Sequence, residues 1–213
     1  MDSAVSDSAT YLDSAEMTLL KIVVTGAFGV GKTTMINSLS ETAPLHTEEV
    51  MTEAGASVDH LVGVRDKATT TVAIDFGRRT LPGDLVLYLF GTPGQKRFKP
   101  LWEDIARGAL GAVVLVDTRR LDASFDVIDM IEEQGLTYAI AVNNFPDAPQ
   151  YPPEVLRDHL DLEPHTPLVI CDARRTTSSV DVLIELVTHL LAQPAPAPES
   201  VPAPESVPAL DAS

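Results

Sequence analysis

The sequence predicts an α/β fold: a mostly parallel sheet with helices on both of its faces. Three observations lead to this prediction. Apolar runs of strand length alternate with segments that carry apolar residues at helical spacing, and a glycine-rich loop follows the first apolar run. In addition, the segment between the second and third runs is too short for a crossover helix. In sheets of this kind, ligands bind at the carboxyl ends of the strands.

Six apolar runs are predicted to form the strands of the sheet. They lie at Leu20–Thr25, Thr71–Phe76, Leu85–Phe90, Ala112–Val116, Tyr138–Val142 and Leu168–Cys171. Only the short segment 79–84, which contains Pro82 and Gly83, connects the second run to the third. These two strands are therefore expected to form an antiparallel hairpin at one edge of the sheet, with the other strands parallel.

Helices are predicted where apolar residues recur at helical spacing. The segments are Thr33–Ser40, Ser124–Gln134, Pro153–Leu160 and Ser179–Ala192. Ser178 and Ser179 have the composition of an N-cap region for the last of them. The region Pro44–Ala68 has no strong periodicity, so we expect a long loop there, and such a loop in a compact domain is usually functional.

Composition predicts one folded domain at residues 19–192 of the 213-residue chain. The acidic segment 1–18 is rich in Ser, Ala and Asp and is expected to be disordered. The segment 193–213 repeats Ala-Pro-Glu-Ser-Val-Pro twice, and its prolines are too dense for a helix or a sheet ladder. We therefore expect a disordered Pro/Ala-rich tail.

The charge balance limits the classes of partner. The formal net charge is −16, and the chain holds no block of Lys and Arg, which disfavours binding to nucleic acid. A signal peptide, an apolar run of membrane-spanning length and a C-terminal prenylation motif are all missing from the sequence. We therefore expect a cytoplasmic protein with no membrane span or lipid anchor, which partners could recruit to a membrane.

The run Gly26-Ala27-Phe28-Gly29-Val30-Gly31-Lys32-Thr33 has the pattern of a Walker A phosphate-binding loop. Lys32 is expected to neutralise charge at the β- and γ-phosphate oxygens, and Thr33 to ligate Mg²⁺. Backbone N–H groups of such a loop wrap a phosphate, and the dipole of the following helix adds positive charge. The predicted nucleotide-binding positions in and beside this loop are Gly26, Phe28, Gly29, Val30, Gly31, Lys32, Thr33 and Thr34.

The segment that opens the second strand resembles the first switch of the small GTPases. In Thr69-Thr70-Thr71-Val72-Ala73-Ile74-Asp75-Phe76, counting back four residues from Asp75 selects Thr71. This threonine would close over Mg²⁺ and the γ-phosphate, with Thr70 as the alternative. The sequence thus predicts Thr33 and Thr71 as metal ligands.

Gly91-Thr92-Pro93-Gly94-Gln95, at the end of the third strand, resembles the second switch. Gly94 would donate its N–H to the γ-phosphate, and Gln95 would act in catalysis by orienting the attacking water. Gly91 stands where the aspartate that supports the metal is usual, so either Thr92 or water substitutes for it or metal binding is weakened. The following segment, Phe98 to Trp102, would contact a partner, or Trp102 would pack beneath the switch.

Base recognition is expected after the last two strands. Val142-Asn143-Asn144-Phe145-Pro146-Asp147 resembles the Asn-Lys-x-Asp guanine motif in either of two registers. In one register Asn143 is the asparagine and Pro146 takes the aspartate position; in the other, Asn144 pairs with Asp147. An aspartate there distinguishes guanine from adenine because it accepts from the guanine N1–H and amine. In Cys171-Asp172-Ala173-Arg174, the Ala173 N–H would meet the guanine O6, and Arg174 would cover the base.

Taken together, these segments and Gly-Ala-Val-Val-Leu-Val-Asp-Thr-Arg-Arg-Leu, at 111–121, resemble the actinobacterial conservon small GTPases, which are relatives of the bacterial Mgl gliding-motility GTPases. The resemblance implies a P-loop, Ras-like fold with a six-stranded sheet and one antiparallel edge hairpin. It also implies a cellular neighbourhood with a roadblock-type regulatory protein and a sensor histidine kinase. In the Mgl relatives an arginine beside the switch threonine assists hydrolysis, whereas this chain has Thr70 there.

The sequence is therefore interpreted as a small GTP-binding protein that binds GTP and GDP with Mg²⁺ and signals through switch movement. Hydrolysis is expected to be slow and assisted by a partner, unless Arg65 or Arg97 supplies a cation. One alternative is a pseudo-GTPase that acts as a nucleotide-binding scaffold. A P-loop small-molecule kinase is a further alternative, disfavoured because no arginine-rich lid lies between the late strands.

Overall fold

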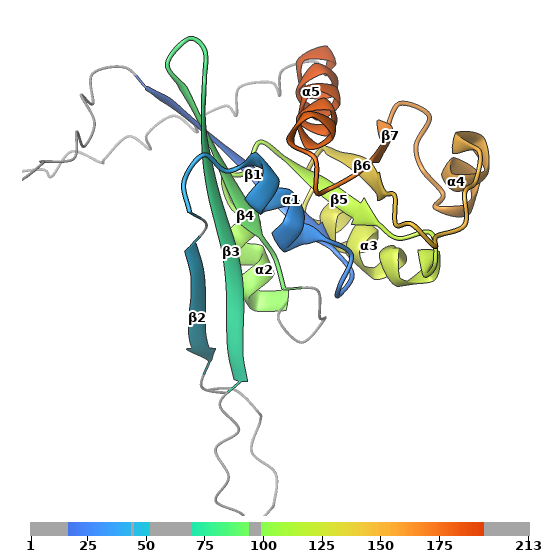
Figure 1. The fold of residues 1–213 in the computed structure, drawn as a ribbon, viewed down its shortest axis with the longest axis horizontal. Helices are drawn as coiled ribbons and strands as arrows, with labels where there is room; N and C mark the ends of the chain where they lie inside the picture. Colours follow the sequence, from blue (N-terminus) through green and yellow to red (C-terminus); the bar gives the residue numbers. More distant parts are fainter. Residues whose placement is uncertain (1–16, 44, 52–69, 94–98, 194–213) are drawn as a thin grey trace, which may run out of the picture.

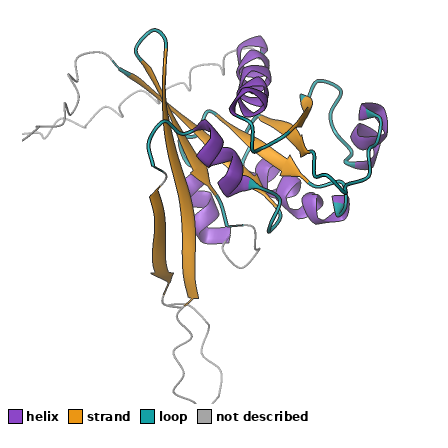
Figure 2. Ribbon diagram, viewed as in Figure 1, coloured by secondary structure: helices purple, strands orange, loops and turns teal. Residues whose placement is uncertain are grey.

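The computed structural model describes residues 17–43, 45–51, 70–93 and 99–193 of the chain. These residues form one twisted sheet with helices packed on both of its faces (Figures 1 and 2). The strands are β1 (Thr18–Gly26), β2 (Leu45–Met51), β3 (Thr70–Leu81), β4 (Leu85–Gly91), β5 (Gly111–Val116), β6 (Tyr138–Asn143) and β7 (Leu168–Cys171).

The strand order across the seven-stranded sheet is β2-β3-β4-β1-β5-β6-β7. β1 pairs in parallel with β4 and β5, and β6 pairs in parallel with β5 and β7. β3 is antiparallel to both of its neighbours, β2 and β4. The predicted α/β fold with a mostly parallel sheet is confirmed, and so is the hairpin, in which Leu81 pairs with Leu85.

The edge of the sheet differs from the prediction. The sheet has a seventh strand, β2, which lies outside the hairpin and forms the edge in its place. Its sequence, LHTEEVM, lies inside the region 44–68 that was expected to be a loop. A strand at an edge needs hydrogen bonds to one neighbour only and does not require an alternating apolar pattern, which is why periodicity did not reveal it.

The helices are α1 (Lys32–Leu39), α2 (Lys99–Ala106), α3 (Phe125–Glu133), preceded by the 3₁₀ turn η2 (Leu121–Ser124), α4 (Pro153–His159) and α5 (Thr176–Ala192). Four of them match predicted segments, and α2 was not predicted as a helix. α5 begins before the expected cap, with Arg175 at its N-cap position. The Ser178 hydroxyl instead accepts a hydrogen bond from the Asp172 N–H at 3.0 Å, so this serine ties α5 to the loop after β7.

Two hydrophobic clusters hold the layers together, one on each face of the sheet. Successive residues of β1 point to opposite faces, so that Ile22 and Val24 join the cluster under α1 and α5, whereas Val23 joins the cluster under α2, α3 and α4. Trp102 is only 2% exposed, which fits the packing alternative for this side chain. In the part of the chain that the structure describes, no helix is long and apolar enough to cross a membrane.

Candidate functional site

The glycine-rich loop connects the end of the central strand β1, at Gly26, to the start of α1, at Lys32. Gly31 precedes α1 in the left-handed conformation, with φ of 109°, and no side chain caps the helix there. The first N–H groups of a helix have no partner within it. The loop and the start of α1 therefore have the arrangement that binds phosphate.

Lys32 lies within this loop and is bound to its backbone. Its Nζ donates to the carbonyl oxygens of Gly26 and Ala27, at 2.9 Å each. Burial lowers the pKa of Lys32 to about 8, and the nearby Asp75 carboxylate opposes this effect. An anion bound in the loop would favour the charged ammonium, because an opposite charge at close range stabilises it.

Thr33 and Asp75 form a short hydrogen bond beside Lys32, with the Thr33 Oγ1 donating to the Asp75 Oδ2 at 2.5 Å. Asp75 lies on β3, across from Gly91 at the end of β4. A Cβ added at Gly91 would lie 2.9 Å from the Asp75 Cβ and 3.3 Å from its Oδ2. The Asp75 side chain therefore occupies the space beside position 91, where sequence reasoning noted the missing carboxylate.

Asp75 was not predicted as a site residue, because in the sequence it serves only to locate Thr71. The available signal was the combination of a missing carboxylate at Gly91 with an aspartate on the strand predicted to pair with it. Thr92, the suggested substitute, is turned away from this place. Its hydroxyl is buried and donates to the Thr25 Oγ1 at 2.7 Å.

The donors beside Lys32 suit Mg²⁺. The described residues contain no group of three His, Cys, Asp or Glu that could enclose a metal ion. Magnesium at a phosphate site, however, is usually held by one or two carboxylates together with phosphate oxygens and waters. The Thr33 hydroxyl and the Asp75 carboxylate, which lie next to each other, are hard oxygen donors of this kind.

Several predicted residues cannot be placed as side chains. Thr71 lies in β3, where it pairs with Val50, but its side chain is outside the described part of the molecule. Gly94, Gln95 and Arg97 lie in the undescribed segment 94–98, and Arg65 lies in the undescribed segment 52–69. Their predicted roles remain predictions.

Asn143, at the end of β6, joins the phosphate loop to the loop after β7. Its Nδ2 donates to the Val30 carbonyl oxygen at 2.9 Å, and its Oδ1 accepts from the Ala173 N–H at 3.1 Å. A Cβ at Gly31 would lie 2.6 Å from the Asn143 Nδ2, so a glycine is needed for this close approach. One side chain, 6% exposed, therefore holds together the loops after β1, β6 and β7.

The other predicted base-site residues make local contacts. The Asn144 Oδ1 accepts from the Gln150 Nε2 at 2.8 Å. Arg174 pairs with Asp172 through two bonds of 2.8 Å, and this hydrogen bonding lowers the pKa of the Asp172 carboxyl. The pKa of the Arg119 guanidinium is raised, mainly by its hydrogen bond to Asp117 and to a lesser extent by the charge of Asp147. Of the two asparagines, Asn143 makes the contact to the phosphate loop, whereas Asn144 binds Gln150.

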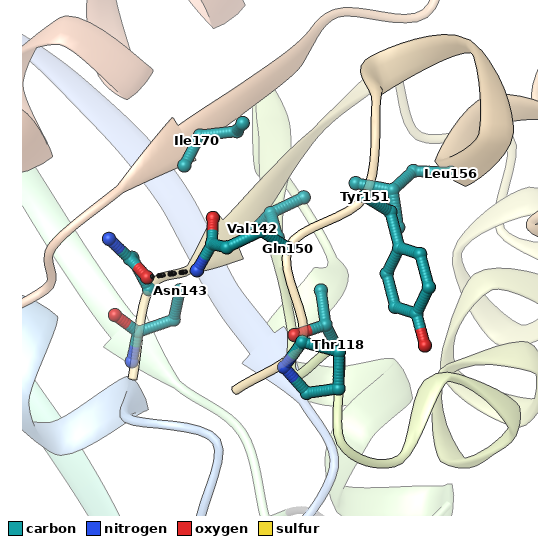
Figure 3. Close-up of a pocket in the computed structure, with 9 residues that line it drawn as sticks. Thr118, Val142, Asn143, Gln150, Tyr151, Leu156 and Ile170 are labelled. Carbon is teal, nitrogen blue, oxygen red and sulfur yellow. Dashed lines mark hydrogen bonds between the residues drawn. The ribbon is translucent and has the colours of Figure 1, made fainter. Parts of the chain in front are cut away.

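A small pocket lies at the ends of β6 and β7, beside Asn144 (Figure 3). The Gln150 amide enters it and forms the hydrogen bond to Asn144. Its lining combines the ends of β6 and β7 with the segment before α4, and consists of Thr118, Val142, Asn143, Asn144, Pro149, Gln150, Tyr151, Leu156 and Ile170.

Three comparisons with known proteins relate this site to others. Residues 24–147 match the family described as "Conserved hypothetical ATP binding protein". The chain is 32% identical over 126 residues to the uncharacterized protein MJ1339 of Methanocaldococcus jannaschii; the matched region covers 58% of this chain and 69% of that protein. It is 28% identical over 144 residues to the Ras-related protein Rab-7b of Mus musculus, which covers 68% of this chain and 61% of that protein.

The solved structures that resemble the chain include the G domain of the T. maritima FeoB iron transporter, with a TM-score of 0.56 and 17% identity over 81% of this chain and 99% of that domain. The FeoB G-domain from Methanococcus jannaschii has a TM-score of 0.56 at 16% identity. At these identities the likeness shows the fold alone, which is that of P-loop G domains. By the family match and its relation to MJ1339, the chain belongs to the family of conserved hypothetical ATP-binding proteins.

Proposed function

We propose that this chain is a small GTP-binding protein that acts as a signalling switch. The observation that carries the proposal is the Asn143 side chain, which joins the phosphate loop at Val30 to the base-side loop at Ala173. A phosphate site and a base site are thereby held in one arrangement. Similarity to Rab-type GTPases supports guanine nucleotides as the ligands.

The phosphate half of the site would bind the nucleotide through the loop N–H groups and Lys32. Thr33 and Asp75 would hold Mg²⁺, and we propose Thr71 as a further ligand when its segment closes. The bound ion would neutralise charge on the β- and γ-phosphate oxygens. Gly94 and Gln95 keep their proposed roles at the γ-phosphate and the attacking water, on the strength of their sequence pattern.

The base half supports the register in which Asn143 is the asparagine of the guanine motif, because Asn143 makes the loop contacts. Pro146 then occupies the aspartate position and offers no acceptor for the guanine N1–H. This observation, with the description of the family as ATP-binding, favours ATP as the second candidate ligand.

Nucleotide competition tests the proposal. Binding of a fluorescent GDP is displaced with GTP, GDP, ATP and XTP, in Mg²⁺ and in EDTA. We expect GTP and GDP to displace at lower concentration than ATP, and all affinities to fall in EDTA. Equal affinity for GTP and ATP would contradict the guanine assignment, and insensitivity to EDTA would contradict the magnesium site.

We propose slow hydrolysis that a partner accelerates, in a switch related to the conservon and Mgl GTPases. By that resemblance, the partners are a roadblock-type protein and a sensor histidine kinase system, which could bring a cytoplasmic protein to the membrane. Single-turnover hydrolysis with and without the roadblock-type protein tests this part. Rates at background in both conditions would favour the pseudo-GTPase alternative.

A further inference from the structure

A second cation reaches the phosphate loop besides Lys32. Arg120 lies in the turn between β5 and η2, and its Nη2 donates to the Phe28 carbonyl oxygen at 3.0 Å. A Cβ added at Gly29 would lie 3.8 Å from this same nitrogen. Since Lys32 binds the carbonyls of Gly26 and Ala27, three successive carbonyl oxygens of the loop are each bound by a cationic side chain.

A buried carboxylate holds Arg120 in this place. Asp117, at the end of β5, is 2% exposed, and the Arg120 Nη2 lies 3.7 Å from its Oδ2. The Arg120 N–H also donates to the Asp117 carbonyl oxygen at 2.9 Å, which closes the turn. Arg119 donates to both carboxylate oxygens of Asp117 and stacks on the ring of Phe145, 4.0 Å from its centroid. Of the two arginines, Arg120 is therefore the one directed at the phosphate loop.

The contact acts on the peptide unit between Phe28 and Gly29. Arg120 binds its carbonyl, and the N–H of the same unit belongs to Gly29 in the phosphate-binding loop. A charged donor on a carbonyl polarises the peptide and strengthens its N–H as a donor. It also fixes the orientation of that N–H before an anion arrives. The chain carries a net charge of −16 and therefore repels a polyanionic ligand. A cation at the loop reduces this repulsion.

We propose that Arg120 is a positioning residue of the phosphate loop, which orients the Phe28–Gly29 peptide and adds a second cation beside Lys32. The ligand that the loop would bind with the help of Arg120 is the di- or triphosphate group of a nucleotide. This inference rests on the proposed nucleotide binding. It assigns a function to an arginine that the sequence motifs leave without one.

The test compares Arg120→Gln and Arg120→Lys with a matched control, Arg107→Gln. Arg107 follows α2, and its guanidinium is exposed beside Asp104 at 3.4 Å, away from the loop. GMP, GDP and GTP compete with fluorescent GDP in Mg²⁺, and circular dichroism checks that each variant is folded. If Arg120 acts at the phosphates, its loss should affect GDP and GTP more than GMP.

We expect Arg120→Gln to weaken GDP and GTP about five- to tenfold, because a charge-assisted contact is lost at a half-exposed site. GMP affinity should change less than about twofold, and Arg120→Lys should recover part of the loss because it restores the charge without the planar fork. Arg107→Gln should leave all three affinities within about twofold.

Unchanged GDP and GTP affinity in Arg120→Gln would overturn this inference while leaving the proposed function in place. An equal loss for GMP, GDP and GTP would also overturn it, since it would indicate general damage to the site. Failure of the unmodified chain to bind any of these nucleotides would overturn the inference and the proposed function together.

Discussion

The phosphate half and the base half of the site each lack a residue of the motif they resemble, and they differ in what takes its place. In the phosphate half, Gly91 stands where an aspartate is usual, and Asp75 from the neighbouring strand lies in that space, bonded to Thr33. In the base half, Pro146 stands where an aspartate is usual. There, the carboxylate of Asp172 is bonded to Arg174 within the loop after β7.

The reason lies in the geometry of a sheet. Phe76 pairs with Phe90 in the antiparallel register of β3 and β4, so the next pair toward the site is Asp75 with Gly91. Directly opposed residues on neighbouring strands place their side chains on the same face of the sheet. Here a Cβ at position 91 would lie only 2.9 Å from the Asp75 Cβ, so one side chain can take over the place of the other. Pro146 lies in a loop after β6, where no strand runs beside it in register. We infer that a lost carboxylate is more easily replaced within a sheet than within a loop.

The largest expected effect tests whether the phosphate half supplies most of the affinity. Lys32→Ala should lower GTP affinity by at least about 100-fold, because it removes a partly buried cation from the phosphates. Lys21→Ala is the matched control, since Lys21 lies on the strand β1 that leads into the loop, but its Nζ donates to the Arg107 carbonyl instead of the loop. Isothermal titration calorimetry measures both, and equal affinities would contradict the assignment of the loop.

A second prediction tests Asp75 as the substitute carboxylate. Asp75→Asn should lower GTP affinity about tenfold in Mg²⁺ and change it little in EDTA, because the amide is a weaker magnesium ligand. Titration of Mg²⁺ at fixed GTP measures the effect. A loss of the same size in EDTA would show that Asp75 supports the loop and not the ion.

Exchanging the two positions makes this test sharper. Gly91→Asp alone should impair the site, because its Cβ would meet the Asp75 Cβ and the Ile36 Cδ1, each at 2.9 Å. In the double variant Asp75→Gly with Gly91→Asp, the contact with the Asp75 Cβ is gone and the carboxylate approaches from β4. The remaining contact is with the Ile36 Cδ1, the end of a side chain that can rotate. We expect the double variant to recover part of the magnesium dependence of GTP affinity that Asp75→Gly loses. If the losses of the two single variants simply add in the double variant, the side chains at positions 75 and 91 do not occupy the same space.

The base half is tested by restoring its missing acceptor. Pro146→Asp should raise the preference for GTP over ATP by about tenfold, because a carboxylate there pairs with the guanine N1–H and amine. Pro146→Ala removes the proline without adding an acceptor and should leave the preference unchanged. If the unmodified chain already prefers GTP over ATP strongly and Pro146→Asp does not increase this preference, another group in the base half replaces the missing aspartate.

The smallest effect concerns the packing beneath the base half. Burial, and then the nearby Asp172 charge, raises the pKa of the Cys171 thiol to about 12 from an ordinary 9.0. The native state therefore binds the thiol proton more tightly, and its contribution to stability is full below about pH 9 and is lost as the pH rises toward 12. At pH 8, thiol labelling should follow unfolding in urea, and rapid labelling of the folded chain would show that this region opens.

Much of the fold was predictable because it depends on local patterns. The buried parallel strands read as continuous apolar runs, and the short turn between Leu81 and Leu85 forces an antiparallel pair. β2 could not be found in this way, because an edge strand with Glu48 and Glu49 has no apolar pattern to detect. α5 was placed too late since Ser178 resembles a cap but is used by the Asp172 N–H.

The sequence by itself determined the phosphate loop, since it depends on a few consecutive residues with fixed backbone requirements. For the base half it left Asn143 and Asn144 open, and the contacts of Asn143 in the structure favoured the first. Only the tertiary structure decided that Asp75 stands beside Gly91 and that Arg120 binds the Phe28 carbonyl. Both contacts join residues distant in the chain, and they follow from strand register and from loops meeting at the carboxyl ends of the strands. Such contacts leave no periodic signal in a single sequence, because no local preference encodes which distant side chain fills a given space.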